Sequence, residues 1–260
     1  MKKLRFIDES EFSGVINMAI DNYLAVGERD EDSEYTLRLY RWTRPTLSCG
    51  FHQHVEKRVN LEKCRELNVD VVRRPTGGRE LMHDGDISFS VSGRFADLKI
   101  ADKDIFYKSG QIITAGLLAV GINARLSESQ KKNGTVSQGP CLAAISQHEI
   151  TVGGKKIVPV AQRIFHDSIL IHGSIPLRSP RIATPYLLNV DAPEDLQKKI
   201  ETLATDIGQL IQGEIELDKL KNAMIEEFQK CFDGECRSID LTQTEINSAM
   251  QSKNDWKIID

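Results

Sequence analysis

The chain has 260 residues, of which 40% are hydrophobic and 28% are charged, and this balance is typical of a folded protein rather than a disordered or fibrous one. Its 34 basic and 38 acidic residues give a formal charge of -4, which does not favour a protein that binds nucleic acid irrespective of sequence. We expect one main folded unit and no nucleic-acid partner.

The N-terminal stretch MKKLRFIDES lacks the apolar centre of a signal peptide, and no apolar run approaches the roughly 18 residues of a membrane-spanning helix. The five cysteines are Cys49, Cys64, Cys141, Cys231 and Cys236. They are odd in number and form no CxxC pair, which disfavours both a disulfide framework and a zinc site. We therefore expect a cytoplasmic protein without a metal or a membrane partner, in which a single cysteine is free to react.

Hydrophobic spacing predicts a mixture of helices and strands along the chain. Helices are expected over residues 10–26, 60–67 and 104–121, with Asn60 as the N-cap of the second. Strands are expected over residues 35–42, 69–74, 87–91, 148–152, 155–162 and 168–177. From residue 192 on, the pattern becomes helical. Because no repeated βαβ alternation appears, the sequence predicts an α+β fold.

The stretch RRPTGGRELMHD, residues 73–84, interrupts the strand pattern with a glycine turn. Gly77 and Gly78 allow positive φ and close approach of a ligand to the backbone, while Arg73, Arg74 and Arg79 bracket the turn. One interpretation is a seat for an anionic group. The other is an ordinary hairpin whose arginines are solvated. The stretch lacks the spacing of a P-loop.

Cys141 follows a polar loop and precedes the hairpin HEITVGGKKIVPVAQ. A reactive thiol needs partial exposure and a nearby positive charge, and Lys155 or Lys156 of that hairpin could supply the charge. Successive strand residues face opposite ways, so only one of these lysines can point inward. From the residues alone, a buried inert cysteine remains the alternative.

Two histidines in or beside the expected strands, His172 and His83, are further candidates for the site. His172 precedes Gly173, and a glycine inside a strand suggests close backbone approach. His83 precedes Asp84. His172 either faces a ligand or is a core residue whose ring is satisfied by hydrogen bonds, and His83 either orients a proton donor or is a structural hydrogen-bonding residue.

These stretches together carry a resemblance to a known family. RRPTGGRELMHDGDISFSV resembles the signature of the lipoate/biotin protein ligase superfamily, and GGKKIVPVAQR with ILIHGSIPL resembles its lysine segment and later histidine-glycine strand. CLAAISQHEITVGGKKI is similar, position by position, to the matching segment of the LipM-type octanoyltransferases. The likeness extends from RFIDES to the terminal NDW.

The resemblance implies a mixed sheet flanked by helices, with a catalytic core over residues 1–190 and a helical C-terminal segment over 191–260 packed on it. It implies an enzyme that moves octanoyl from acyl carrier protein to a lysine of a lipoyl-domain protein, such as the glycine-cleavage H protein, without a cofactor. Cys141 matches the nucleophile that carries the acyl group as a thioester, and Lys156 matches the lysine that holds the oxyanion. The other matched positions are expected to bind substrate: Arg74, Thr76, Gly77, Gly78, Arg79, His83, Ala161, Gln162, His172 and Gly173.

The chain departs from the family pattern at Pro159 and Val160, where glycine and serine are usual. Bulkier residues there would narrow the pocket. Three alternatives stay open: an ATP-dependent lipoate or octanoate ligase of the same fold, an amidotransferase acting between lipoyl domains, and a noncatalytic module that binds acyl groups or the carrier.

Overall fold

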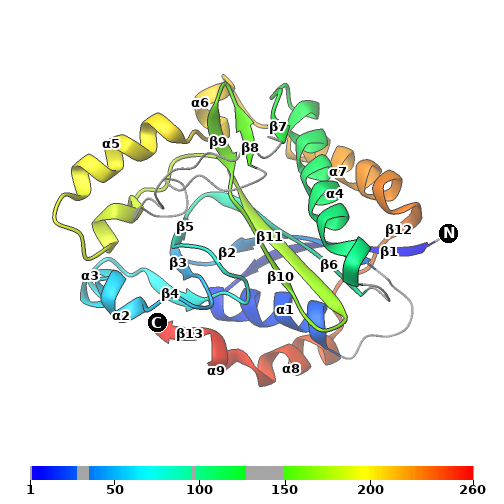
Figure 1. The fold of residues 1–260 in the computed structure, drawn as a ribbon, viewed down its shortest axis with the longest axis horizontal. Helices are drawn as coiled ribbons and strands as arrows, with labels where there is room; N and C mark the ends of the chain where they lie inside the picture. The colour runs from blue at the N-terminus through cyan, green and yellow to red at the C-terminus, as the bar shows by residue number, and fades with distance from the viewer. Residues whose placement is uncertain (1, 28–34, 95–97, 127–148, 260) are drawn as a thin grey trace.

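The computed structural model describes residues 2–27, 35–94, 98–126 and 149–259, which form three β-sheets flanked by helices (Figure 1). The strands are β1 (Lys2–Phe12), β2 (Tyr35–Trp42), β3 (Thr46–Cys49), β4 (Asp70–Arg73), β5 (Leu81–His83), β6 (Asp86–Arg94), β7 (Arg125–Leu126), β8 (Ile150–Val152), β9 (Lys155–Val158), β10 (Val160–Ile164), β11 (Ser168–Pro176), β12 (Gly234–Ser238) and β13 (Lys257–Ile259). The helices are α1 (Gly14–Val26), α2 (Val55–Arg58), α3 (Leu61–Glu66), α4 (Leu98–Ala119), α5 (Pro193–Leu203), α6 (Ile207–Leu210), α7 (Leu217–Phe232), α8 (Gln243–Gln251) and α9 (Lys253–Trp256). The predicted α+β class is confirmed.

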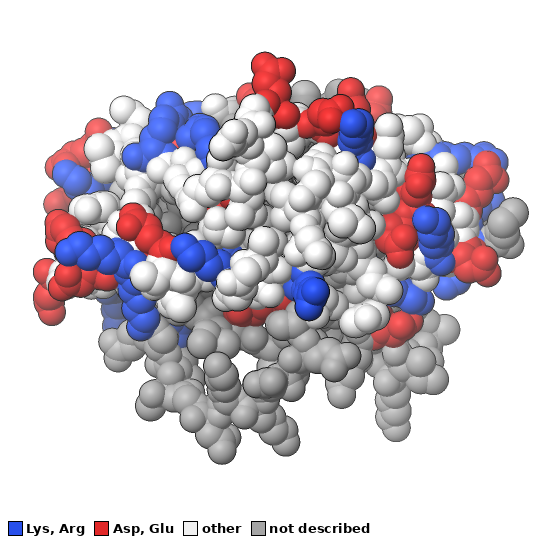
Figure 2. Space-filling view, turned by 90° about the horizontal axis from the view of Figure 1, so that it is seen from above, with Lys and Arg blue, Asp and Glu red and all other residues white. Residues whose placement is uncertain are grey.

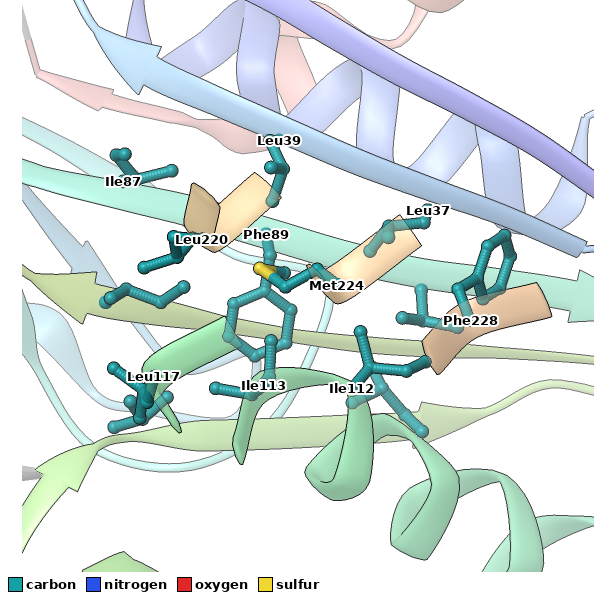
Figure 3. Close-up of a cluster of buried hydrophobic side chains, with 14 of the residues drawn as sticks. Leu37, Leu39, Ile87, Phe89, Ile112, Ile113, Leu117, Leu220, Met224 and Phe228 are labelled. Atoms are coloured by element: carbon teal, nitrogen blue, oxygen red, sulfur yellow. The ribbon is translucent and has the colours of Figure 1, made fainter. Parts of the chain in front are cut away.

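The largest sheet has the order β10-β11-β6-β2-β1-β12, with parallel pairing at β1–β2 and β1–β12 and antiparallel pairing elsewhere. Helices α4 and α7 cover one of its faces (Figure 1). Figure 3 shows side chains of α4 and α7, such as Ile113 and Met224, directed at Leu37 of β2 and Phe89 of β6. Burial of this apolar surface is the main stabilising contribution on that side of the sheet.

The opposite face of the sheet is covered by α1, and α8 and α9 pack behind α1 (Figure 1). The predicted helix over residues 10–26 exists, but it begins at Gly14, because β1 extends through Phe12 as part of the sheet. Pairing with β2 therefore outweighs the helical spacing of the first residues. The short helix α3 has the predicted cap, since the Asn60 side chain accepts a hydrogen bond from the backbone N–H of Lys63 at 2.9 Å.

Strands β4 and β5 flank the glycine turn but do not pair with each other. Both pair with β3, β4 in parallel and β5 antiparallel, in the sheet ordered β13-β4-β3-β5. The interpretation of this stretch as an ordinary hairpin is therefore wrong. The glycine turn instead crosses the end of β3, where the carbonyl oxygen of Gly78 lies so close to Gly50 that an added Cβ at Gly50 would meet it at 2.1 Å.

The predicted hairpin at Gly153 and Gly154 is confirmed: β8 and β9 pair antiparallel, and the two glycines have φ of +56° and +81°. The strand expected over residues 155–162 is divided in two. Pro159 has no N–H to donate, and the chain leaves the β7-β8-β9 sheet there and enters the largest sheet as β10. This division brings the end of β9 beside β11.

The C-terminal segment contributes strands as well as helices. Leu220, Met224 and Phe228 of α7 belong to the main core, β12 extends the largest sheet, and β13 pairs with β4. The segment from residue 191 on is thus interleaved with the first part of the chain, while a boundary at residue 190 stays a prediction.

The face in Figure 2 carries basic and acidic side chains in mixed groups around a broad uncharged area. None of the helices within the described ranges combines the length and the apolar character that crossing a bilayer requires.

Candidate active site

An apolar pocket lies where β10 and β11 of the largest sheet meet the β3–β5 region. Five of the residues expected to bind substrate line it: Arg74, His83, Ala161, His172 and Gly173. Further walls come from α1, β2 and the corner between β9 and β10, through Met18, Tyr40, Trp42, Pro159 and Val160. The pocket encloses about 340 Å³, part of it open to solvent. Pro159 and Val160, which replace the usual glycine and serine, therefore form part of its wall.

His172 is the centre of a buried chain of hydrogen bonds behind the pocket. Its Nδ1 lies 3.3 Å from Asp21 Oδ2, and its Nε2 lies 2.5 Å from Thr76 Oγ1. The carboxylate of Asp21 also accepts hydrogen bonds from Arg38 Nη1 and Tyr40 OH, both at 2.8 Å. Because ionised Asp21 can only accept, Nδ1 of His172 carries the proton, and the Thr76 hydroxyl donates to Nε2. This chain ties β11 to α1, β2 and the glycine turn.

The protonation states in this chain follow from burial and charge. Burial by itself would raise the pKa of Asp21, but the bond from His172 and the charge of Arg38 outweigh it and hold that pKa below its ordinary value. Burial lowers the pKa of His172, only partly opposed by Asp21. Burial and the charge of Asp21 raise the pKa of Tyr40. At neutral pH the histidine ring is therefore neutral beside an ion pair of Asp21 and Arg38.

His83 is held rigidly at the other side of the pocket. Its Nδ1 lies 2.9 Å from Asp86 Oδ2, its Nε2 lies 2.9 Å from Ser48 Oγ, and its ring stacks on Trp42 with centroids 4.0 Å apart. Asp86 is buried, and the bonds from His83, Ser174 and Ser88 outweigh the effect of burial and lower its pKa. Both histidines therefore combine hydrogen bonds inside the protein with a position on the pocket wall.

The glycine turn is held in place by Arg74. Arg74 is buried and donates to the carbonyl oxygens of Ser48, Gly77 and Arg79, at 2.9, 2.8 and 2.8 Å. Gly78 has φ of +98°, as the sequence predicted for this turn, whereas nothing lies within 4 Å of an added Cβ at Gly77. The turn is thus fixed by hydrogen bonds of Arg74 to the backbone.

The two lysines of the hairpin point in different directions, as expected. Lys156 is buried, and its Nζ lies 3.1 Å from Glu149 Oε1. Lys155 is more exposed, and its Nζ donates to the carbonyl oxygen of Glu201 at 2.8 Å. Lys156 is therefore the inward lysine. Gln162, also expected in the pocket, has an exposed side chain on β10.

Cys141 lies outside the described residues, whereas the other four cysteines are described. Burial raises the pKa of Cys49 to about 12 and the pKa values of Cys64, Cys231 and Cys236 to about 11. At neutral pH these four thiols are protonated and are poor nucleophiles. In the described ranges, no three or more histidine, cysteine, aspartate or glutamate side chains gather in a way that could hold a metal ion.

The sequence reasoning missed Asp21, Arg38 and Tyr40. The available signal was an aspartate beside the apolar residues Met18 and Ile20 of an amphipathic helix, where a buried charge requires a partner. The partner is Arg38, on a strand expected to be half buried but in fact buried on both faces over most of its length.

A family model for the lipoyl protein ligase A/B catalytic domain matches residues 13–229. The chain belongs to the lipoyl protein ligase A/B catalytic-domain family. Within this family it is 32% identical to "Octanoyltransferase LipM" of Carboxydothermus hydrogenoformans over 90% of this chain and 88% of that protein. It is 28% identical to the protein of the same name from Bacillus subtilis over 94% of this chain and 91% of that protein. The expected enzyme class, an octanoyltransferase, is confirmed by these relatives.

Solved structures confirm the lipoate ligase fold of this family member. A bipartite lipoate protein ligase from Thermoplasma acidophilum aligns with a TM-score of 0.79 at 20% identity, covering 98% of this chain and 93% of that one. Lipoate-protein ligase A bound with ATP aligns with a TM-score of 0.77 at 21% identity, covering 98% and 95%. At these identities the likeness concerns the fold alone.

Proposed function

We propose that the chain transfers an octanoyl group from acyl carrier protein, through a thioester on Cys141, to a lysine of a lipoyl-domain protein such as the glycine-cleavage H protein. The observation that carries the proposal is the apolar pocket between β10, β11 and β5, which belongs to a chain whose relatives are named octanoyltransferases. An eight-carbon chain needs an apolar pocket, and one with a few convergent polar groups is what small-ligand sites have in common.

The reaction consists of two acyl exchanges. The Cys141 thiolate attacks the carbonyl carbon of the donor thioester, the carrier thiol leaves, and the octanoyl group is now bonded to Sγ. The neutral amine of the acceptor lysine then attacks this thioester, an amide forms, and the Cys141 thiol is released. Exchange between thioesters is nearly neutral in free energy and amide formation is downhill, so the sequence of steps balances without ATP.

Two features of the described residues support this assignment of roles. The four other cysteines have pKa values raised to about 11 or 12 by burial, which argues against each of them as the nucleophilic thiolate and favours Cys141 in that role. Lys156 lies in β9, three residues before Pro159 of the pocket wall, and its buried Nζ pairs with Glu149. A buried cation is well suited to stabilise the oxyanion of each tetrahedral intermediate.

Intact-mass spectrometry after incubation with octanoyl-acyl carrier protein tests the proposal. We expect the protein to gain one octanoyl group, to lose it on treatment with hydroxylamine, and to transfer it to the H protein. Cys141→Ser should abolish the hydroxylamine-sensitive adduct and the transfer, whereas Cys64→Ser, the matched control at a buried thiol, should retain both. Full transfer by Cys141→Ser would rule out the thioester on that residue.

The same assay separates the alternatives. A ligase would require ATP and free octanoate or lipoate, as the fold neighbour solved with ATP would suggest. An amidotransferase would accept octanoyl from an octanoylated lipoyl domain in preference to the carrier. A noncatalytic module would show binding with neither adduct nor transfer. We expect ATP-independent transfer from the carrier.

A further inference from the structure

Beside the apolar pocket lies a second, polar hollow that we call the arginine groove. Four arginines line it: Arg41 at the end of β2, Arg44 just after it, and Arg178 and Arg181 in the loop after β11. The groove encloses about 950 Å³, including space open to solvent. The groove thus brings together two pairs of arginines that are far apart in the sequence.

Carboxylates also line this groove, but the buried ones lie behind the cations. Asp84 and Asp86 have side chains only 4% and 5% exposed, whereas those of Arg178 and Arg181 are 49% and 67% exposed. Glu11, the third lining carboxylate, is exposed and stands opposite Arg41 in the β1–β2 pairing. A molecule entering the groove therefore meets the guanidinium groups of Arg178 and Arg181 before the carboxylates of Asp84 and Asp86.

Arg178 and Arg181 share the single carboxylate of Asp84. Nη2 of Arg178 lies 3.1 Å from Oδ1, Nη2 of Arg181 lies 2.9 Å from Oδ1, and the backbone N–H of Arg181 donates to Oδ2 at 2.8 Å. Burial would raise the pKa of Asp84, but the bonds from Arg181 and Arg178 outweigh it, so the pKa is lowered and the carboxylate stays ionised. Within this group of three side chains, two guanidinium groups share one carboxylate.

The groove and the apolar pocket share a wall. Trp42 and His83, stacked with ring centroids 4.0 Å apart, line both of them. The two hollows therefore lie side by side, one with mainly apolar walls and one lined by arginines, with these two rings between them.

We propose that the arginine groove binds the phosphate of the phosphopantetheine arm that carries the octanoyl thioester, with Arg178 and Arg181 as its principal ligands. This inference rests on the proposed function, because it takes a thioester on such an arm as the donor. The arm has the matching polarity: an acyl chain at one end, a neutral amide-containing linker, and a phosphate at the other. Guanidinium groups suit phosphate because their planar N–H pairs match two of its oxygens.

Donors that differ only in the phosphate test this inference. We would measure kcat/KM for transfer to the H protein from octanoyl-phosphopantetheine and from octanoyl-pantetheine. For the native chain the phosphorylated donor should be better by roughly tenfold or more, because the arginines form charge-assisted hydrogen bonds with the phosphate and none with the bare hydroxyl. The preference should shrink at high salt because the arginines are exposed.

Glutamine variants of Arg178 and Arg181 test whether these two arginines cause the preference for the phosphorylated donor. In Arg178→Gln/Arg181→Gln the preference should fall to nearly onefold, and in Arg181→Gln, which keeps Arg178 on Asp84, it should be intermediate. Arg237→Gln is the matched control, because Arg237 is an equally exposed arginine on β12, outside the groove, and the preference should be unchanged. Thermal melting of each variant identifies any that fails to fold. If the double variant does not fold, the donor preference of Arg181→Gln tests the inference.

Three outcomes would overturn the inference: no preference in the native chain, the same preference in the folded variants, or slower transfer from octanoyl-acyl carrier protein with the small-donor preference intact. The last result would show that the arginines contact the protein surface of the carrier and not the phosphate of its arm. If the native chain transferred from no donor, the proposed function would fail. Calorimetry with phosphopantetheine and pantetheine would then test the phosphate site by itself. The site requires that the native chain binds phosphopantetheine more tightly than pantetheine and that the double variant does not.

Discussion

Lys156 is buried with its Nζ 3.1 Å from Glu149 Oε1, and its neighbour Lys155 points to the carbonyl oxygen of Glu201. If the Lys156 ammonium stabilises the oxyanion, Lys156→Ala should lower kcat for octanoyl transfer by roughly 100-fold or more, as the loss of an oxyanion donor does elsewhere. Steady-state kinetics with octanoyl-acyl carrier protein would measure this. Lys155→Ala, which removes a charge of the same kind one residue away, should leave kcat nearly unchanged.

A substitution at Glu149 distinguishes a catalytic role of Lys156 from a structural one. Removing the lysine leaves the largely buried Glu149 carboxylate without this partner, which destabilises the fold. Glu149→Gln breaks the same ion pair but keeps the ammonium. A catalytic lysine predicts that Glu149→Gln loses stability and retains most of its kcat. Equal loss of kcat in Glu149→Gln and Lys156→Ala would assign Lys156 to the fold alone.

The corner between β9 and β10 is the element that shapes the pocket. Pro159 ends β9, and its carbonyl oxygen accepts a hydrogen bond from the backbone N–H of Ser174 at 3.2 Å. Gly173 sits opposite, where an added Cβ would meet that carbonyl oxygen at 2.4 Å and the ring of Phe89 at 2.8 Å. Neither atom is the far end of a flexible side chain. The close approach of β10 to β11 therefore requires glycine at this position.

Gly173→Ala should accordingly force β10 away from β11. We expect a loss of roughly 1 to 3 kcal/mol in the free energy of unfolding, the usual cost of an overpacked interior, together with weaker acyl binding. Chemical denaturation would measure the loss. Gly77→Ala is the control for stability, because nothing lies within 4 Å of an added Cβ there. A Gly173→Ala variant as stable as the native chain would show that the corner can relax.

Local patterns predicted the elements but not how they meet. The strand at Tyr35–Trp42, the capped helix after Asn60 and the hairpin at Gly153 each depend on residues within a few positions of one another. The glycine turn crosses β3, and the bond between Asp21 and His172 joins residues 151 positions apart. No local pattern specifies such contacts. The family resemblance supplied the pocket positions of His172 and Gly173, whereas Asp21 required the fold.

At the scale of the whole molecule, the chain of Asp21, Arg38 and His172 ties α1 to the middle strands of the largest sheet. Global unfolding must break it, so the free energy of unfolding should depend on pH through these groups. Burial lowers the pKa of His172 below its ordinary value of 6.5, so the unfolded chain binds a proton on this ring at a higher pH than the folded chain does. The stability that His172 contributes is therefore complete above about pH 6.5 and is lost as the pH falls below it.

The buried carboxylates also reduce the free energy of unfolding as the pH falls, but at lower pH than His172 does. The pKa values of Asp21, Asp84 and Asp86 are held below the ordinary 3.8, so their contribution is present above that pH and is lost as the pH falls through the folded values. We expect the free energy of unfolding, measured by denaturant titration, to decline in a first stage as the pH falls below about 6.5 and in a second stage as it falls below 3.8.

A substitution at His172 separates the first stage from the second. His172→Asn keeps a donor for Asp21 without a titrating ring, so it should lower stability overall but flatten the decline that begins below about pH 6.5. His166→Asn, at an exposed histidine, should keep the native slope. An unchanged slope in His172→Asn would mean that the first stage comes from another group. The second stage should persist in both variants, because Asp84 and Asp86 keep their own donors at Arg181 and His83.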